Sequence, residues 1–217
     1  DKRWFRNTVP WRRKDAYAIP LGVDTKLFHP ARQDDLTERS KCTFLFTGDL
    51  SYTPNTEACR HLIEQILPAL PQDITMVFGG RRPPDFIIRA STVDKRIHVT
   101  GFVEDLSAVY RSSDVMLAPI FQGAGMQNKI LEASATGLPC ITTPVCAKAF
   151  PTQLPNLLIA SKSDSFISHA LALYADPVHR RQLGTQGRNH VESKYSWDAR
   201  ADTLLRMVLP CLPPVRS

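Results

Sequence analysis

The sequence predicts an α/β fold, a doubly wound parallel sheet of about six strands with helices on both faces. From residue 43 onward, short apolar runs alternate with longer amphipathic stretches, and several of the apolar runs end in Gly or Pro. Parallel strands joined by helices require right-handed crossovers, which place helices over both faces of the sheet. The expected strands are residues 43–48, 74–80, 96–101, 114–120, 139–143 and 156–161.

The expected helices lie between and after these strands. The clearest is 55–70, whose apolar positions follow a three-and-four spacing until Pro68 marks the end. Ser196 is a suitable N-cap for the last helix. The other expected helices are 104–112, 126–136, 164–175, 177–194 and 196–208.

Composition and charge exclude several classes of protein. The 217 residues are 43% hydrophobic and 22% charged, as in an ordinary globular domain. The longest clear apolar run, 115–121, is far shorter than the roughly 18 to 20 residues of a membrane helix. The start is basic and aromatic, without the apolar core of a signal peptide and without an initiator Met, which suggests a piece of a longer protein.

The formal net charge of +6 is concentrated near the start, because six Lys or Arg residues fall within positions 2–14. Interleaved with Trp4, Phe5 and Trp11, they could contact anionic lipid or nucleic acid. A solvated or interdomain segment is the alternative that general charge patterning favours. We expect no nucleic-acid partner.

The cysteine and histidine positions argue against a metal site. The five cysteines are an odd number without CxxC spacing, which fits a reducing cytoplasm, and Cys42 and Cys140 lie at the edges of apolar runs where buried thiols are common. No His and Cys cluster has metal-ligand spacing, so no metal is expected, and His98 is expected to pack within its strand. The sequence also lacks the G-x-S-x-G elbow of a Ser-His-Asp hydrolase.

Sheets of this kind bind ligands beyond the carboxyl ends of the strands, near the switch in strand order. The candidate site therefore lies in the loops that follow the strands, 48–54, 79–84, 101–105 and 119–127.

The last of these loops begins the segment GAGMQNKILEASATG at 123–137, which carries Lys129 three residues ahead of Glu132. Residues three apart are neighbours on a helix surface, so both side chains can face one space. A cation in the opening turns of a helix is unfavourable unless an anion binds there. The pair therefore indicates a ligand with an anionic part and hydroxyl groups. The alternative without a ligand is an exposed Glu132 paired with Lys129, after a glycine-rich turn that only changes the chain direction.

Five segments taken together closely resemble the group-1 retaining glycosyltransferases of the GT-B fold. More narrowly, GDLSYTPN and the pattern G-x-G-x-x-x-K-x-L-E look like a bacterial polysaccharide and cell-envelope sugar-transferase branch. The resemblance covers about residues 19–200. The segments are IPLGVDTKLFHP (19–30), FLFTGDLSYTPN (44–55), MVFGG (76–80), IHVTGFVEDLSAVYRSSDVMLAPI (97–120) and GAGMQNKILEASATGLPCITT (123–143).

The resemblance implies one half of a two-domain enzyme. In that family two Rossmann-like domains face each other across a cleft, the C-terminal one binding the nucleotide sugar and the N-terminal one holding the acceptor and the catalytic base. This chain resembles the C-terminal half. Residues 19–217 would then form the Rossmann-like nucleotide-sugar-binding domain, and residues 1–18 would be a basic linker or a remnant of the N-terminal half.

The resemblance also implies roles for single residues. Glu132 matches the carboxylate that accepts hydrogen bonds from the ribose hydroxyls, and Lys129 would meet the diphosphate; these two are the candidate catalytic residues. The candidate donor-binding residues are Gly48, Asn55, Arg81, Phe102, Val103, Gly123, Ala124, Gly125 and Met126.

These donor-binding candidates have different expected tasks. Gly48 and the 123–126 loop would allow a close approach of backbone N–H groups to phosphate and sugar. Phe102 and Val103 correspond to the loop that cups the nucleobase, with core packing as the alternative. Asn55, together with Ser51 and Tyr52, would either line the donor pocket or build a turn and helix cap.

Two departures from the family pattern bear on activity. The first Glu of the family's Glu, seven residues, Glu pattern falls at Ala124, so the usual carboxylate for the donor sugar is missing. The Arg and Lys that many relatives carry after the first strand are replaced by GDLSYTPN, which leaves Arg81, Arg82 and Lys129 as the nearby cations.

The expected function is that of the donor-binding domain of a hexosyltransferase. It would move a hexose from a nucleotide diphosphate sugar to a saccharide or lipid-linked acceptor with retention, using no cofactor besides this donor. The N-terminal GT-B domain would be its missing partner, so the fragment alone would be inactive. The expected location is the cytoplasm, with peripheral attachment to the inner face of the membrane as an option. The alternative is a non-catalytic nucleotide-sugar-binding or scaffold domain with a degenerate donor site.

Overall fold

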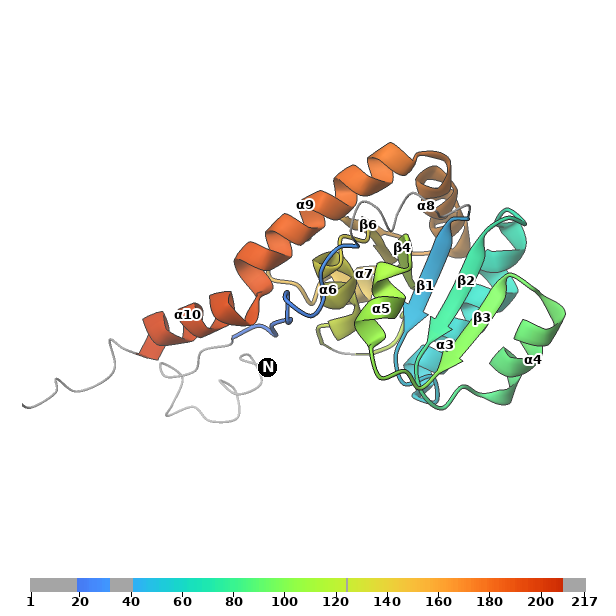
Figure 1. Cartoon of the computed structure of the whole chain (residues 1–217), viewed down its shortest axis with the longest axis horizontal. Coiled ribbons are helices and arrows are strands. Elements are labelled where there is room, and N and C mark those ends of the chain that lie inside the picture. The colour runs from blue at the N-terminus through green and yellow to red at the C-terminus, as the bar shows by residue number, and fades with distance from the viewer. Residues whose placement is uncertain (1–18, 32–40, 124, 209–217) are drawn as a thin grey trace, which may run out of the picture.

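The computed structural model describes residues 19–31, 41–123 and 125–208. The basic segment 1–18, Ala124 and Cys211 therefore lie outside the described residues, and so does the expected domain boundary after residue 18. Within the described part, a single sheet is flanked by helices, and the last two helices run along and then away from the sheet (Figure 1).

The six expected strands are all present, and every pairing between them is parallel. Their order in the sheet is β3-β2-β1-β4-β5-β6, so the order reverses between β1 and β4. This confirms the doubly wound α/β fold. The strands are β1 Thr43–Thr47, β2 Thr75–Gly79, β3 Ile97–Gly101, β4 Val115–Ala118, β5 Cys140–Thr142 and β6 Leu157–Ile159.

The helices differ from the expected set in three places. The expected helix at 55–70 is an α-helix only as far as His61, and continues as a π-helical turn at Leu62–Ile66 and a 3₁₀ turn at Leu67–Ala69. Two short helices, α4 and α7, were not expected, because nine and four residues are too few to establish a helical period. The helices are α3 Thr53–His61, α4 Asp85–Val93, α5 Leu106–Arg111, α6 Asn128–Ala135, α7 Pro144–Ala147, α8 Ser163–Ala175, α9 Pro177–Tyr195 and α10 Trp197–Val208.

Apolar side chains fill the space on both sides of the central strands. Phe44, Leu45 and Phe46 in β1 are all fully buried, although successive residues of a strand point to opposite faces. The π turn after α3 packs against α8, while α6 packs against α5 and α9, so helices cover both faces of the sheet (Figure 1). Both faces of β1 are therefore core.

The expectations for cysteine and histidine had different outcomes. Four cysteines, Cys42, Cys59, Cys140 and Cys146, are buried free thiols. His98 is exposed, because β3 is an edge strand, so the expectation that it packs in the strand was wrong. No helix within the described residues is long and apolar enough to cross a membrane.

The first described segment joins the end of α9. Val23 pairs with Ser196 in a parallel bridge, and its N–H donates to the Tyr195 carbonyl at 2.8 Å. A Cβ on Gly22 would lie 2.6 Å from the Trp197 ring, so only glycine fits there. From this junction α10, which has no buried residue, extends away from the sheet (Figure 1).

Candidate functional site

The candidate site lies at the carboxyl edge of the sheet, where the strand order reverses between β1 and β4. The end of β1 and the start of α6 meet there across a pocket of about 300 Å³. Both residues expected to act on a ligand, Lys129 and Glu132, line it. The complete lining is Thr47, Gly48, Leu106, Met126, Gln127, Asn128, Lys129 and Glu132.

Lys129 is an almost fully buried cation in the first turn of α6, with only 7% of its surface exposed. Its Nζ donates to Asn55 Oδ1 at 2.7 Å and sits 4.1 Å from the centroid of the Phe46 ring. Burial lowers the pKa of Lys129 to about 8. No carboxylate in the described part of the chain pairs with this ammonium group within 4 Å, so one hydrogen bond and one ring face are its compensation.

Glu132 lies one turn further along α6 and is partly buried. Its Oε2 accepts a hydrogen bond from the Tyr110 hydroxyl at 2.7 Å. Burial raises its pKa, while the Tyr110 hydrogen bond and the charge of Lys129 lower it. The alternative of an exposed Glu132 paired with Lys129 does not hold, because neither side chain is exposed and their charged atoms make no ion pair among the described residues.

Gly48 brings backbone to the edge of the same pocket. Its φ of 148° is a conformation that side-chain-bearing residues rarely adopt. A Cβ at this position would lie 2.8 Å from Asn55 Nδ2 and 3.3 Å from Lys129 Nζ. Glycine at position 48 therefore makes room for the Asn55–Lys129 contact.

Asn55 connects the loop after β1 with Lys129. Its Nδ2 donates to the Asp49 carbonyl at 2.8 Å, and its Oδ1 accepts from Lys129. Asn55 does not line the pocket itself. It therefore holds Lys129 and the loop together, which is a third role besides the two considered from the sequence.

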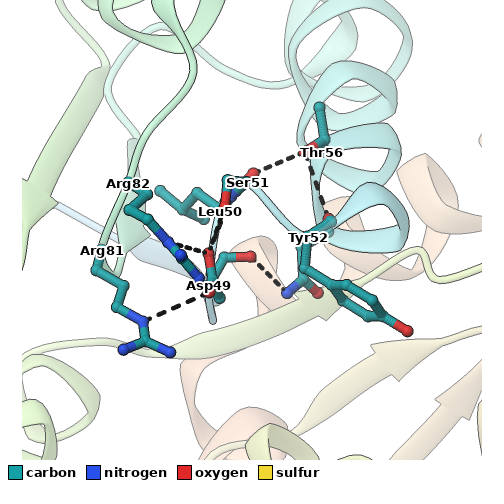
Figure 2. Close-up of polar contacts among 8 residues, drawn as sticks. Asp49, Leu50, Ser51, Tyr52, Thr56, Arg81 and Arg82 are labelled. Atoms are coloured by element: carbon teal, nitrogen blue, oxygen red, sulfur yellow. Dashed lines mark hydrogen bonds and ion pairs between the residues drawn. The ribbon is translucent and has the colours of Figure 1, made fainter.

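Asp49, in the loop after β1, forms ion pairs with two arginines from the loop after β2 (Figure 2). Arg82 makes a bidentate contact to the Asp49 carboxylate, and Arg81 Nε lies 3.4 Å from Asp49 Oδ2. The Arg82 hydrogen bond holds the pKa of Asp49 well below its usual range. Two guanidinium groups on one carboxylate leave an excess of positive charge beside Gly48, although Arg81 is not among the residues that line the pocket.

The other candidate residues surround the pocket at different distances from its centre. Met126 lines it, whereas Gly123 and Gly125, with φ of 134° and 93°, lie exposed in the loop before α6. Phe102 is 75% exposed at the end of β3, so the alternative of core packing does not apply to it, and Val103 is half-buried. Neither of these two lines the pocket.

The comparison with protein families identifies the chain. A family model described as "Glycosyl transferases group 1" matches residues 41–176. The chain belongs to this family.

Two curated relatives show how much of a complete enzyme the chain spans. The GDP-mannose-dependent monoacylated alpha-(1-6)-phosphatidylinositol monomannoside mannosyltransferase of Corynebacterium glutamicum is 27% identical over 209 residues, which cover 88% of this chain and 55% of that protein. The UDP-Gal:alpha-D-GlcNAc-diphosphoundecaprenol alpha-1,3-galactosyltransferase of Escherichia coli is 31% identical over 164 residues, 69% of this chain and 40% of that protein. The chain thus spans about half the length of the curated relatives that it matches.

Solved structures share the fold. The C-terminal domain of the group 1 glycosyl transferase LpcC from Francisella tularensis is 24% identical with a TM-score of 0.63, and the match covers 81% of this chain and 100% of that domain. Anabaena HepE in complex with UDP-glucose is 14% identical with a TM-score of 0.75, over 93% of this chain and 59% of that one. The whole of the LpcC domain is covered, so the two share the fold of that entire domain.

For this group 1 domain, sequence reasoning missed three residues of the site. Phe46 lies under Lys129, Asp49 holds Arg81 and Arg82, and Tyr110 holds Glu132. Tyr110 and Phe46 occur within ordinary apolar patterns, so no local signal marks them. Asp49 carried one signal, since it is a carboxylate at the expected phosphate-binding loop.

Within the described residues, no group of three or more His, Cys, Asp or Glu side chains comes together in a way that could hold a metal ion. The positive charge at this site instead comes from Lys129, Arg81 and Arg82.

Proposed function

We propose that the chain is the donor-binding domain of a glycosyltransferase that moves a hexose from a nucleotide diphosphate sugar to a saccharide or lipid-linked acceptor, with retention. The observation that carries this proposal is the Lys129–Glu132 pair, which lines one pocket at the switch point of the sheet without forming an ion pair. A buried cation without a counter-ion favours an anionic ligand, and a carboxylate with free lone pairs favours a diol. A nucleoside diphosphate carries both groups.

The names of similar proteins support this class of donor. The Corynebacterium relative is named as GDP-mannose-dependent, the Escherichia coli relative uses UDP-Gal, and HepE was solved with UDP-glucose. Because both GDP and UDP sugars occur among them, we leave the nucleobase of this chain's donor open. Their named acceptors, a phosphatidylinositol mannoside and a sugar-diphosphoundecaprenol, support a lipid-linked acceptor.

In the proposed reaction the chain stabilises the departing diphosphate. Lys129 would neutralise its charge, and backbone N–H groups in the 123–126 loop would donate to its oxygens. The Gly48 N–H donates to the Gly79 carbonyl at 3.0 Å, so Gly48 would contribute only space for the phosphate. Arg81 and Arg82 would add positive charge from the loop after β2. Glu132 would fix the ribose and hence the position of the leaving group.

The acceptor wall and the catalytic base would belong to an N-terminal GT-B domain. This part of the proposal rests on the family resemblance and on the chain spanning about half the length of its relatives. The domain described here would then bind donor without turning it over.

We infer a cytoplasmic location from the thiols. All four described cysteines are free and buried, which suits a reducing compartment. Peripheral contact with the inner face of the membrane would rest on residues 1–18, where the basic and aromatic residues gather.

The experiment that tests the function is calorimetric titration with a panel of UDP, GDP, ADP and TDP sugars. Lys129→Ala serves as the binding-defective variant. Glu64→Gln is the control, because Glu64 is exposed on the helical segment after β1 and, within the described part of the chain, forms an ion pair with Arg60 alone. We expect one nucleotide class to bind the parent and the control and to bind Lys129→Ala much more weakly. If well-folded parent protein bound none of the panel, the donor-binding proposal would be wrong, and the missing carboxylate at Ala124 would favour a scaffold domain with a degenerate site.

A further inference from the structure

Beneath the pocket, a fully buried tyrosine contacts the carboxylate that we assign to the ribose. Tyr110 comes from α5, whose first residue, Leu106, lines the pocket, and it is fully buried. We propose that Tyr110 is a positioning residue which, together with Thr47, holds the Glu132 carboxylate in the orientation that receives the ribose diol of the donor. This inference rests on the proposed function.

The hydrogen bonds around Tyr110 form a chain with one direction. The Tyr110 hydroxyl lies 2.7 Å from Glu132 Oε2 and 2.6 Å from Thr47 Oγ1. An ionised carboxylate only accepts, so the single phenolic proton goes to Glu132, and the Thr47 hydroxyl must donate to the phenol oxygen. Hydrogen bonds aligned in this way strengthen one another.

The hydrogen bonds from Thr47 through Tyr110 to Glu132 leave one oxygen of the carboxylate free for a ligand. Oε2 receives the Tyr110 proton, whereas Oε1 accepts no hydrogen bond from the part of the chain that the structure describes. Both oxygens keep open lone pairs, and Glu132 lines the pocket beside Lys129. The carboxylate can therefore accept from two neighbouring hydroxyls while Tyr110 prevents its rotation.

Packing fixes the tyrosine ring itself. The Phe28 ring forms a T-shaped contact with it, at a centroid distance of 5.4 Å and an interplanar angle of 88°. Phe28 is anchored in turn, since its carbonyl accepts from Arg188 at 2.8 Å, and the same guanidinium nitrogen donates to the Ala135 carbonyl at the end of α6. Tyr110 and the helix that carries Glu132 are therefore held by one framework.

The hydrogen bond from Tyr110 also affects the pKa of Glu132. Burial raises its pKa, and the Tyr110 hydrogen bond and Lys129 oppose that rise. These are the titratable groups that act on Glu132, from α5 and from its own helix, while Cys140 in β5 acts on Tyr110. Removing the phenol hydroxyl should therefore allow Glu132 to take up a proton at a higher pH.

The test compares ribose with deoxyribose. UDP, 2′-deoxy-UDP, GDP and 2′-deoxy-GDP are titrated into the parent, Tyr110→Phe and Tyr174→Phe by calorimetry between pH 5.5 and pH 8, conditions that we choose to cover the neutral range. Tyr174→Phe is the matched control, because the Tyr174 hydroxyl on α8 also donates to a carboxylate, that of Asp73 before β2, at 2.8 Å, but this hydrogen bond is exposed.

We expect the parent and the control to prefer the ribonucleotide by roughly tenfold, and Tyr110→Phe to bind the ribonucleotide about tenfold more weakly with most of that preference lost. As the pH is lowered, the affinity of Tyr110→Phe for the ribonucleotide should begin to fall at a higher pH than the affinity of the parent. A purely structural role would weaken ribo- and deoxyribonucleotides equally and leave the pH profile in place, which would overturn the inference. If Tyr110→Phe does not fold, Thr47→Val takes its place, because it removes only the hydroxyl that donates to the Tyr110 oxygen. This variant should show the same changes at smaller amplitude. An unchanged preference for the ribonucleotide in Thr47→Val would also overturn the inference. If neither UDP nor GDP bound the parent, the proposed function itself would fall, a result distinct from retained binding with unchanged ribose preference.

Discussion

Replacing Lys129 with methionine should make the ligand-free domain more stable while removing its affinity for nucleotide. Methionine matches the length of the lysine side chain and can keep the contact with the Phe46 ring. What it removes is the cost of a buried charge. Lowering the pKa of Lys129 from 10.5 to about 8 corresponds to about 3 kcal/mol against folding at neutral pH.

The substitution also has a cost of its own. Asn55 Oδ1 would lose its donor, and a buried unsatisfied acceptor costs about 1 to 3 kcal/mol. Lost cation–π and gained sulfur–aromatic contacts with Phe46 are of similar size and roughly cancel. We therefore expect a net gain of up to about 2 kcal/mol, which raises Tm by up to about 8 °C for a domain of this size.

The pH dependence separates this explanation from a general packing effect. Between about pH 8 and 10.5 the unfolded chain binds the Lys129 proton and the folded chain does not, so the parent gains stability as pH rises through this window. The advantage of Lys129→Met should therefore be full at pH 7 and shrink toward pH 10. Titrating groups that do not interact with Lys129 affect both proteins alike.

Calorimetric or optical melting of the parent, Lys129→Met and Lys95→Met at pH 7 and pH 10 measures this difference. Lys95 is exposed, so its replacement controls for the loss of one surface charge. Two results would refute the idea that the unpaired buried cation destabilises the ligand-free domain. One is a Tm for Lys129→Met several degrees below that of the parent at pH 7. The other is a Tm difference between the two proteins that does not change with pH.

Three further predictions concern the ligand. Glu132→Ala should keep the fold and weaken nucleotide binding roughly ten- to a hundredfold, because charged hydrogen bonds to the ribose are lost, and titration with equal affinity would contradict the ribose assignment. Nucleoside diphosphate affinity of the parent should decline as pH rises above about 8, where Lys129 loses its proton, and titration at pH 7, 8 and 9 measures this decline; a constant affinity over that range would contradict a contact between Lys129 and the diphosphate. The chain alone should bind a donor but transfer no sugar, because the closed cleft of the complete enzyme supplies up to about 7 to 11 kcal/mol of the barrier; steady acceptor-dependent release of nucleoside diphosphate that Lys129→Ala abolishes would show a complete active site instead.

The sequence predicted the sheet better than the helices. Most of the strands are short apolar runs with Gly or Pro at one end, and all six are present. Helix α4 was missed because Pro83 and Pro84 resemble a loop and the nine residues after them are too few for a period. The π turn after His61 keeps the apolar spacing of an α-helix, so the sequence does not distinguish it from one.

For the site, the sequence indicated which residues face the pocket but not what holds them. Lys129 and Glu132 are three apart on one helix, so their common direction follows from local geometry. Their partners are distant, since Asn55 is 74 residues from Lys129 and Tyr110 is 22 residues from Glu132. The pairing of Asp49 with Arg81 and Arg82 also depends on two loops meeting across β1 and β2, a contact that the register of the sheet creates.

The most direct measurement of the central claim is a crystal structure of the chain soaked with UDP or GDP, whichever binds in the titration. The proposed function predicts the nucleotide at the carboxyl edge between β1 and β4, with the ribose hydroxyls within hydrogen-bond distance of the Glu132 carboxylate and a phosphate oxygen within reach of Lys129 Nζ. A nucleotide bound elsewhere on the domain, or bound in this pocket with its ribose turned away from Glu132, would contradict the account.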